Sequence, residues 1–181
     1  MQSIQLWHGS RRWLGSPEIR APKQGRYECG PGLYLTTRYL RARDYAKAGG
    51  VTTLVTLREA IGWLEETKLP FDSVLSFIKD TPRLRNRAEI LEYFVTQRAG
   101  SDLVPAATLV NLCVNYEALA GKNGVVLAEW LTAQGIDASL HRVNSQEQWV
   151  VVFNPKIIQR YEVIPASKVR LEDYELPLVQ G

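Results

Sequence analysis

Residues 30–46 read GPGLYLTTRYLRARDYA and pass from a strand pattern to a helix pattern within a few residues. The segment 32–37 has the aromatic and β-branched content of a strand. The segment 38–49 has helical composition, with apolar side chains that can share one flank and a glycine pair that stops it. We therefore expect a strand that leads straight into a helix, with Tyr34 on the strand and Tyr45 on the helix.

The rest of the chain places β-rich ends around a helical middle. Strands are expected at 3–8, 51–57, 136–142, 147–154 and 159–164. Helices are expected at 59–68, 71–80, 83–98, 105–121 and 122–134. Residues 9–32 are rich in Gly, Pro, Arg and Lys and are expected to form a long loop, and no internal repeat is apparent. The expected fold class is α+β, a single domain over residues 1–181 with a helical insertion at 58–134.

Composition sets broad bounds on function. The 181 residues carry 22 Lys and Arg against 19 Asp and Glu, and the formal charge of +3 tolerates a polyanionic partner without indicating one. The two cysteines, Cys29 and Cys113, are too few for a zinc site, and we expect free thiols in a reducing compartment. No stretch approaches the ~20 apolar residues of a membrane span. We expect no membrane association and a cytoplasmic location, with export as a secreted effector left open.

Residues 6–10, LWHGS, lie at the end of the first expected strand and contain the first candidate site residues. The absence of a side chain at Gly9 lets a flat ligand approach the backbone N–H and C=O, which can bond a carboxamide, and Ser10 adds a hydroxyl. Tyr34 and Tyr45 are placed to stack on an aromatic ring. An acid at the start of a later strand can bond a ribose hydroxyl and stabilise a developing cation. Together these residues predict a pocket for nicotinamide and its ribose.

Other nucleotide and catalytic motifs are missing. A dinucleotide-binding GxGxxG run is excluded because Leu35 stands where the third glycine would be needed. The chain also lacks GxxxxGK[ST], a nucleophile elbow and HExxH, so neither a phosphate-binding loop nor a zinc hydrolase is indicated.

LWHGSRRW, GPGLYLTT and RARDYA, in this order, resemble the catalytic domain of ADP-ribosyltransferases of the diphtheria-toxin and poly(ADP-ribose) polymerase type, which carry a His-Tyr-Glu signature. The resemblance covers residues 4–57 and 135–164 and leaves 58–134 unexplained. It implies a split β-sheet core, NAD as co-substrate and no metal. It further implies transfer of a single ADP-ribose, with release of nicotinamide, to a macromolecular acceptor that is a protein or a nucleic acid. A small stand-alone bacterial member is often a toxin, which implies an antitoxin protein as a partner.

The resemblance also implies roles for single residues. His8 would bond a ribose hydroxyl and Gly9 the nicotinamide amide, beside Ser10. Tyr34, which follows Gly32, would be the signature tyrosine, and Tyr45 would stack on the other face of the ring. Arg11 or Arg12 would meet the pyrophosphate, because guanidinium groups suit phosphate oxygens.

The catalytic acid is left with two candidates, Glu147 and Gln148. We favour Glu147 because a carboxylate stabilises an oxocarbenium ion better than an amide does. In an extended strand Glu147, Trp149, Val151 and Phe153 face one way and Gln148 faces the other. The helix also departs from the family pattern, because Arg41 stands where many relatives have a serine.

Two other classes of function stay open. One is an NAD glycohydrolase or an RNA 2′-phosphotransferase on a similar fold, and the other is a non-catalytic binding module that keeps the pocket. Release of nicotinamide without an acceptor separates the first from a transferase. A catalytic acid that points away from the pocket favours the second. The helical middle is expected to lie beside the NAD cleft and to help select the acceptor.

Overall fold

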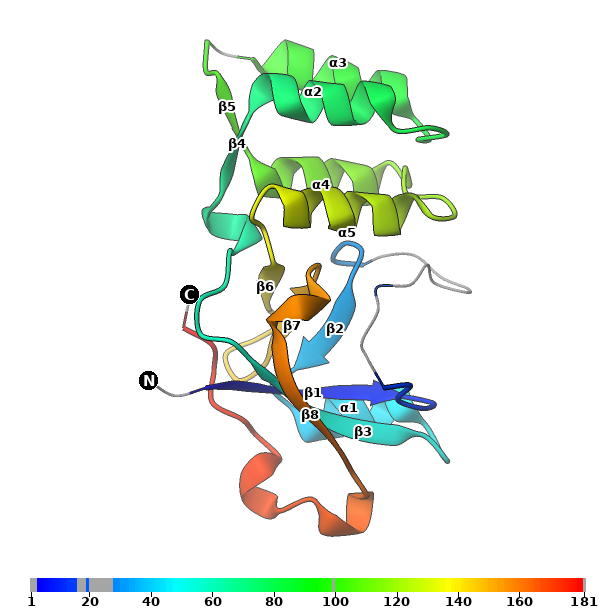
Figure 1. The fold of residues 1–181 in the computed structure, drawn as a ribbon, viewed down its shortest axis with the longest axis vertical. Coiled ribbons are helices and arrows are strands. Elements are labelled where there is room, and N and C mark those ends of the chain that lie inside the picture. The colour runs from blue at the N-terminus through cyan, green and yellow to red at the C-terminus, as the bar shows by residue number, and fades with distance from the viewer. Residues whose placement is uncertain (1–2, 16–18, 20–27, 99, 181) are drawn as a thin grey trace.

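The structure, a computed structural model, describes residues 3–15, 19, 28–98 and 100–180 (Figure 1). It is a mixed α/β fold, and its main sheet is antiparallel with the strand order β6-β7-β2-β1-β3-β8. The strands are β1 (Ile4–Ser10), β2 (Leu33–Thr36), β3 (Val51–Leu57), β6 (Ala138–Arg142), β7 (Gln148–Val152) and β8 (Ile158–Ile164). The α+β class and these strands are confirmed. Of the expected loop, residues 16–18 and 20–27 lie outside the described part of the chain, and β1 itself runs on through Ser10.

Successive side chains along each strand point to opposite faces of the sheet, and each face packs into a different hydrophobic cluster. Leu6, Leu35 and Val150 lie on one face, which the C-terminal Val179 helps to cover. We call this the Leu6 face. The opposite face carries Trp7 and is covered over β1 by helix α1 (Tyr39–Ala46), so we call it the α1 face.

Helix α1 lies very close to β1 because small residues meet at the contact. Its buried residues, Tyr39, Ala42 and Ala46, follow helical spacing along one stripe. A Cβ atom built on Gly9 would lie 1.7 Å from the carbonyl oxygen of Ala42, so only glycine fits there. Tyr39 then packs against Trp7 with a ring-centroid distance of 5.1 Å.

The insertion consists of two strand–helix–helix units (Figure 1). The first contains β4 (Lys68–Pro70), α2 (Phe71–Asp80) and α3 (Arg87–Gln97), and the second β5 (Leu103–Pro105), α4 (Ala106–Asn115) and α5 (Asn123–Ala133). Strands β4 and β5 pair with each other, and their ends are tied reciprocally. The N–H of Phe71 donates to the carbonyl of Asp102 (2.8 Å), and that of Ala106 donates to the carbonyl of Thr67 (2.9 Å). The sequence showed no repeat because the two units share little beyond the proline that ends each strand, Pro70 and Pro105.

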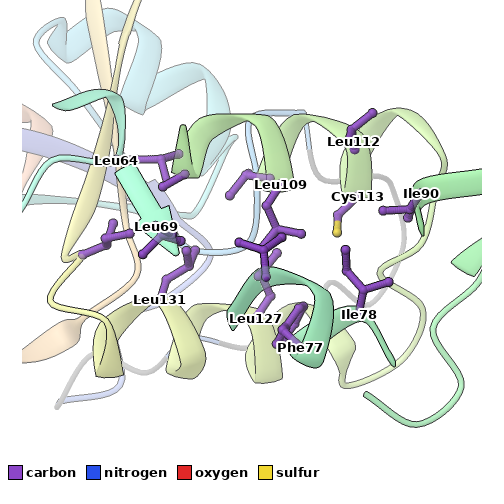
Figure 2. Close-up of a cluster of buried hydrophobic side chains, with 14 of the residues drawn as sticks. Leu64, Leu69, Phe77, Ile78, Ile90, Leu109, Leu112, Cys113, Leu127 and Leu131 are labelled. Carbon is purple, nitrogen blue, oxygen red and sulfur yellow. The ribbon is translucent and has the colours of Figure 1, made fainter. Parts of the chain in front are cut away.

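One hydrophobic cluster joins the two units to the sheet. Figure 2 shows its helical part, with side chains from both units meeting between the helix layers. The same cluster includes Val151 and Phe153 from the α1 face of the sheet. The insertion is therefore held against the sheet by a shared apolar core, with buried area as the main stabilising contribution.

The helix expected at 59–68 is wrong. The structure places bends there, then a 3₁₀ turn at Leu64–Glu66 and the start of β4. The segment runs extended because Trp63 pairs with Ala138 at the start of β6 and the N–H of Gly62 donates to the Asp137 carboxylate at 2.9 Å. Tertiary hydrogen bonds thus override a favourable local composition.

The structure also bears on the expectations for the cysteines and for membrane-spanning helices. Both cysteines are free thiols, Cys113 buried and Cys29 partly buried, as expected. Among the described residues, no helix is long and apolar enough to cross a membrane.

Candidate functional site

Three sequence motifs that are far apart along the chain become neighbouring strands. β2, with the GLYLTT motif, lies between β1, with the His-Gly-Ser motif, and β7, with the Glu-Gln motif. Thr36 of β2 is paired with Trp7 on one side and with Trp149 on the other. The fold therefore gathers the motifs on which the sequence argument depended.

The sheet opens between β1 and β2. In the described residues these strands pair only at Trp7 and Thr36, and Figure 1 shows them crossing steeply beyond that point. The His8 ring spans the gap, with Nδ1 2.8 Å from the carbonyl oxygen of Tyr34. A carbonyl only accepts, so Nδ1 carries the hydrogen and Nε2 carries the free lone pair. Burial lowers the pKa of His8, and the bond to Tyr34 offsets part of that effect, so the ring is neutral at pH 7.

The residues that follow His8 have local roles. Gly9 is required by the approach of α1 described above, whether or not a ligand binds there. The Ser10 hydroxyl donates to the carbonyl of Arg12 at 3.1 Å. Arg11 and Arg12 are exposed. Their contact with a pyrophosphate stays a prediction.

The two tyrosines lie in different surroundings. The Tyr34 hydroxyl donates to the carbonyl of Gly30 (2.6 Å) and accepts from the N–H of Cys29 (3.1 Å), which ties the segment before β2 to the strand. Gly32 is held by close packing, because a Cβ there would lie 2.6 Å from the Val152 carbonyl oxygen. Tyr45 is 56% exposed, and its ring meets Trp149 edge-on with centroids 6.5 Å apart. A stack of Tyr34 and Tyr45 on one ring stays a prediction.

Glu147 is the most heavily bonded acid of this region. Its side chain is fully buried, and Arg41 clamps it through two bonds, Nε to Oε1 at 2.9 Å and Nη2 to Oε2 at 3.1 Å. Trp149 Nε1 (2.9 Å) and the Thr36 hydroxyl (3.3 Å) also donate to Oε1. Burial alone would raise the pKa of Glu147, but the hydrogen bonds from Arg41, Trp149 and Thr36 bring that pKa below its ordinary value. Glu147 is therefore ionised at pH 7.

Gln148 points to the Leu6 face, as strand alternation requires. Its amide nitrogen donates to the carbonyl of Val179 at 3.1 Å, and its amide oxygen accepts from the N–H of Val179 at 2.6 Å. Both polar ends of the side chain are thus used to hold the C-terminal segment. Val151 and Phe153 belong to the opposite cluster, which confirms the alternation expected for 147–154.

Charged groups surround the exposed Tyr45. Burial, followed by the charge of Glu28, raises the pKa of Tyr45, with a further increase from Glu147 and an opposing effect of Arg41. Two carboxylates and the Arg41 guanidinium thus all act on a ring that is open to solvent.

The structure separates two residues that the sequence grouped. Side chains two apart on a strand share a face. His8 therefore lies on the Leu6 face, whereas Glu147 lies on the α1 face with Trp149. Among the described contacts, none joins His8 to Glu147. Trp149, whose indole N–H donates to Glu147, was not among the predicted site residues, although the alternation already placed it on the face of Glu147.

A scan against family models found no match, and neither did searches of curated proteins and of solved structures. In the described part of the chain, no group of three or more His, Cys, Asp or Glu side chains could hold a metal ion. The chemical argument therefore depends on the side chains just described.

Proposed function

We propose that this chain is an NAD-dependent ADP-ribosyltransferase with an ADP-ribosyltransferase-like split sheet, which moves a single ADP-ribose from NAD to a macromolecular acceptor. The observation that carries the proposal is the ionised carboxylate of Glu147 beside the exposed ring of Tyr45. The adjacency of β7, β2 and β1 supports it, because three motifs of the resembled family come together in one part of the sheet.

Glu147, rather than Gln148, is the acid in this proposal. Nicotinamide leaves when the C1″–N bond breaks, and its electron pair goes to the ring nitrogen, which is a cation in NAD. The ribose then carries an oxocarbenium-like charge, and a nearby carboxylate lowers the energy of that state, as in glycoside hydrolysis. Gln148 is neutral and already bonded to Val179.

The aromatic and histidine side chains take binding roles. Tyr45 offers an exposed face for the nicotinamide ring, next to Trp149 and the two carboxylates. His8 keeps a lone pair on Nε2 that can accept a hydrogen bond from a ribose hydroxyl. Since His8 and Glu147 extend from opposite faces, we assign His8 to the adenosine-side ribose, across the gap between β1 and β2.

Arg41 has to move in this mechanism. It covers Glu147 and neutralises its charge, but the Arg41 side chain is itself 39% exposed and can turn toward solvent or toward a pyrophosphate. A non-catalytic NAD-binding module is the second candidate, because the same bidentate pair would hold Glu147 out of reach. NAD binding without nicotinamide release distinguishes this candidate.

The test is nicotinamide release from NAD, followed by chromatography, for the wild type and for Glu147→Gln. We expect Glu147→Gln to bind NAD but to lower the turnover by about 10²–10³, the usual effect of losing one group that stabilises transition-state charge. Glu66→Gln, an exposed acid on the 64–66 turn, is the matched control and should match the wild type. A Glu147→Gln protein that turns over NAD normally refutes the role of Glu147.

The acceptor is addressed with adenylate-labelled NAD. Incubation with a cell lysate, then treatment with nuclease or protease, separates a nucleic-acid acceptor from a protein acceptor. Nicotinamide release at the same rate with and without lysate, and no labelled macromolecule, indicates an NAD glycohydrolase instead. A toxin role with a protein antitoxin belongs to the same proposal. Inhibition of nicotinamide release by a co-expressed protein that is encoded next to this chain would support that role.

A further inference from the structure

A second polar cluster lies on the α1 face of the sheet, next to the proposed site. It consists of Glu65, from the 3₁₀ turn Leu64–Glu66, with Ser139 and His141, from β6. The Ser139 hydroxyl is hydrogen-bonded to Glu65 Oε1 and lies 2.7 Å from His141 Nε2. The other oxygen of Glu65 accepts from the N–H of Leu140 at 3.1 Å.

The bonding pattern fixes the hydrogens of this chain. The Ser139 hydroxyl has a single hydrogen, and it donates that hydrogen to Glu65. The Ser139 oxygen therefore accepts from His141, and Nε2 of His141 carries the ring hydrogen. Nδ1 of His141 then holds a free lone pair, and no protein group bonds to it in the described part of the chain. His8 has the opposite arrangement, with its hydrogen on Nδ1.

His141 is close to Glu147 by strand register. His141 is paired directly with Trp149. Glu147 comes two residues before Trp149, just ahead of β7, and therefore lies on the same face, diagonally across from His141. Diagonal neighbours in an antiparallel pair are within reach of long side chains. His141 and Glu147 therefore start from neighbouring positions on one face, as a displacement at a sugar carbon requires of the group that stabilises the cation and the group that activates the nucleophile.

We propose that His141, positioned by Ser139 and Glu65, is the base that takes the proton from the acceptor, and that the acceptor group is a hydroxyl. This inference rests on the proposed function. The acceptor oxygen forms its bond to C1″ as the C1″–N bond breaks, the electron pair leaves with nicotinamide, and the hydroxyl proton goes to Nδ1. The imidazolium then returns that proton to solvent.

The surroundings suit a base that works at neutral pH. Burial lowers the pKa of His141, and the charge of Glu65 offsets part of that effect, so the ring is neutral and can accept a proton at pH 7. Other charged groups near this cluster include Glu147, its partner Arg41 and, beside Tyr45, Glu28. A guanidinium acceptor is disfavoured because a guanidinium holds its proton too tightly for a neutral imidazole to remove it.

The first test measures the tautomer and needs no substrate. The chain has only two histidines, so ¹⁵N NMR of the imidazole rings is assigned by comparing wild type, His8→Gln and His141→Gln. We expect neutral rings of opposite tautomer at pH 7.5, with Nε2–H in His141, and a mixed tautomer for His141 in Ser139→Ala. An Nδ1–H tautomer or an imidazolium at His141 overturns the proposal.

The second test uses methanol as the hydroxyl probe and agmatine as a guanidinium probe. With NAD and methanol, we expect His141→Gln to form methyl-ADP-ribose at least tenfold more slowly than the wild type. Glutamine keeps an N–H donor for Ser139, and Arg142→Gln is the neighbouring control. Methanol products that are unchanged in His141→Gln, or wild-type transfer to agmatine in preference to methanol, overturn the inference while the proposed function stands. A wild-type protein that releases no nicotinamide overturns both.

Discussion

Removal of Arg41 is the sharpest test of the site, because it uncovers a buried charge. Arg41→Met keeps an unbranched apolar stem and deletes both charge-assisted bonds to Glu147. Glu147 would keep only the bonds from Thr36 and Trp149. We therefore expect a loss of stability that is larger than for an ordinary surface arginine.

The size of the expected stability loss follows from how exposed the side chains of Arg41 and Glu147 are. Breaking a fully buried pair by removing one partner costs about 3–5 kcal/mol, whereas an exposed pair contributes about 0–1 kcal/mol. Glu147 is fully buried but the Arg41 side chain is 39% exposed, so water can replace part of the lost bonding. We expect Arg41→Met to lower the free energy of unfolding by about 1–3 kcal/mol. Glu147→Gln should cost less, because the freed Arg41 can return to solvent.

Urea denaturation at pH 7 measures this as a double-mutant cycle of Arg41→Met, Glu147→Gln and both together. We expect a coupling of at least about 1 kcal/mol, since the two side chains are in contact. Arg43→Met, an exposed arginine on the same helix, should stay within about 0.5 kcal/mol of the wild type. A coupling near zero would show that the pair contributes nothing and that the depressed pKa argument for Glu147 is wrong.

The pH dependence of the same difference has a definite sign. The pKa of Glu147 lies below its ordinary value in the folded protein, so its contribution to stability is complete above about pH 4.5 and is lost as the pH falls through the folded pKa. Without Arg41 the pKa of Glu147 moves upward, so the variant binds the Glu147 proton at a higher pH than the wild type, and the stability difference between wild type and Arg41→Met should shrink as the pH falls from 7. A difference that grows on acidification contradicts the assignment.

Three further outcomes are expected. Gly9→Ala should destabilise the fold by at least about 1–3 kcal/mol, as overpacking does, because its Cβ would lie 1.7 Å from the Ala42 oxygen, and a urea midpoint equal to that of the wild type would show that this contact is absent. Tyr45→Ala should raise the KM for NAD by roughly fivefold, the equivalent of about 1 kcal/mol of stacking, and leave urea stability unchanged because the ring is exposed; an unchanged KM removes Tyr45 from the site. The wild type should lose stability as the pH falls below about 6.5. Burial lowers the pKa of both His8 and His141, so below that pH the unfolded chain binds more protons than the folded protein. Urea midpoints that stay constant down to pH 5 would argue against both pKa shifts.

The sequence by itself determined most of the local elements and which of their side chains share a face. β-branched runs predicted β3, helical spacing predicted α2, and strand alternation put Glu147 and Gln148 on opposite faces, because side-chain period and backbone sterics are properties of neighbouring residues. The resemblance of short motifs pointed to an NAD pocket from positions alone. None of this required knowledge of distant contacts.

Only the tertiary structure decided what each side chain meets. The Arg41–Glu147 clamp joins residues on a helix and a later strand, and the Glu65–Ser139–His141 chain depends on a segment that composition assigned to a helix. The two strand–helix–helix units of the insertion became visible through the β4–β5 pairing, since backbone hydrogen bonds do not depend on which side chains each unit carries. Sequence patterns fix which face a residue occupies, but the partners on that face come from chain segments brought together by burial of the shared core.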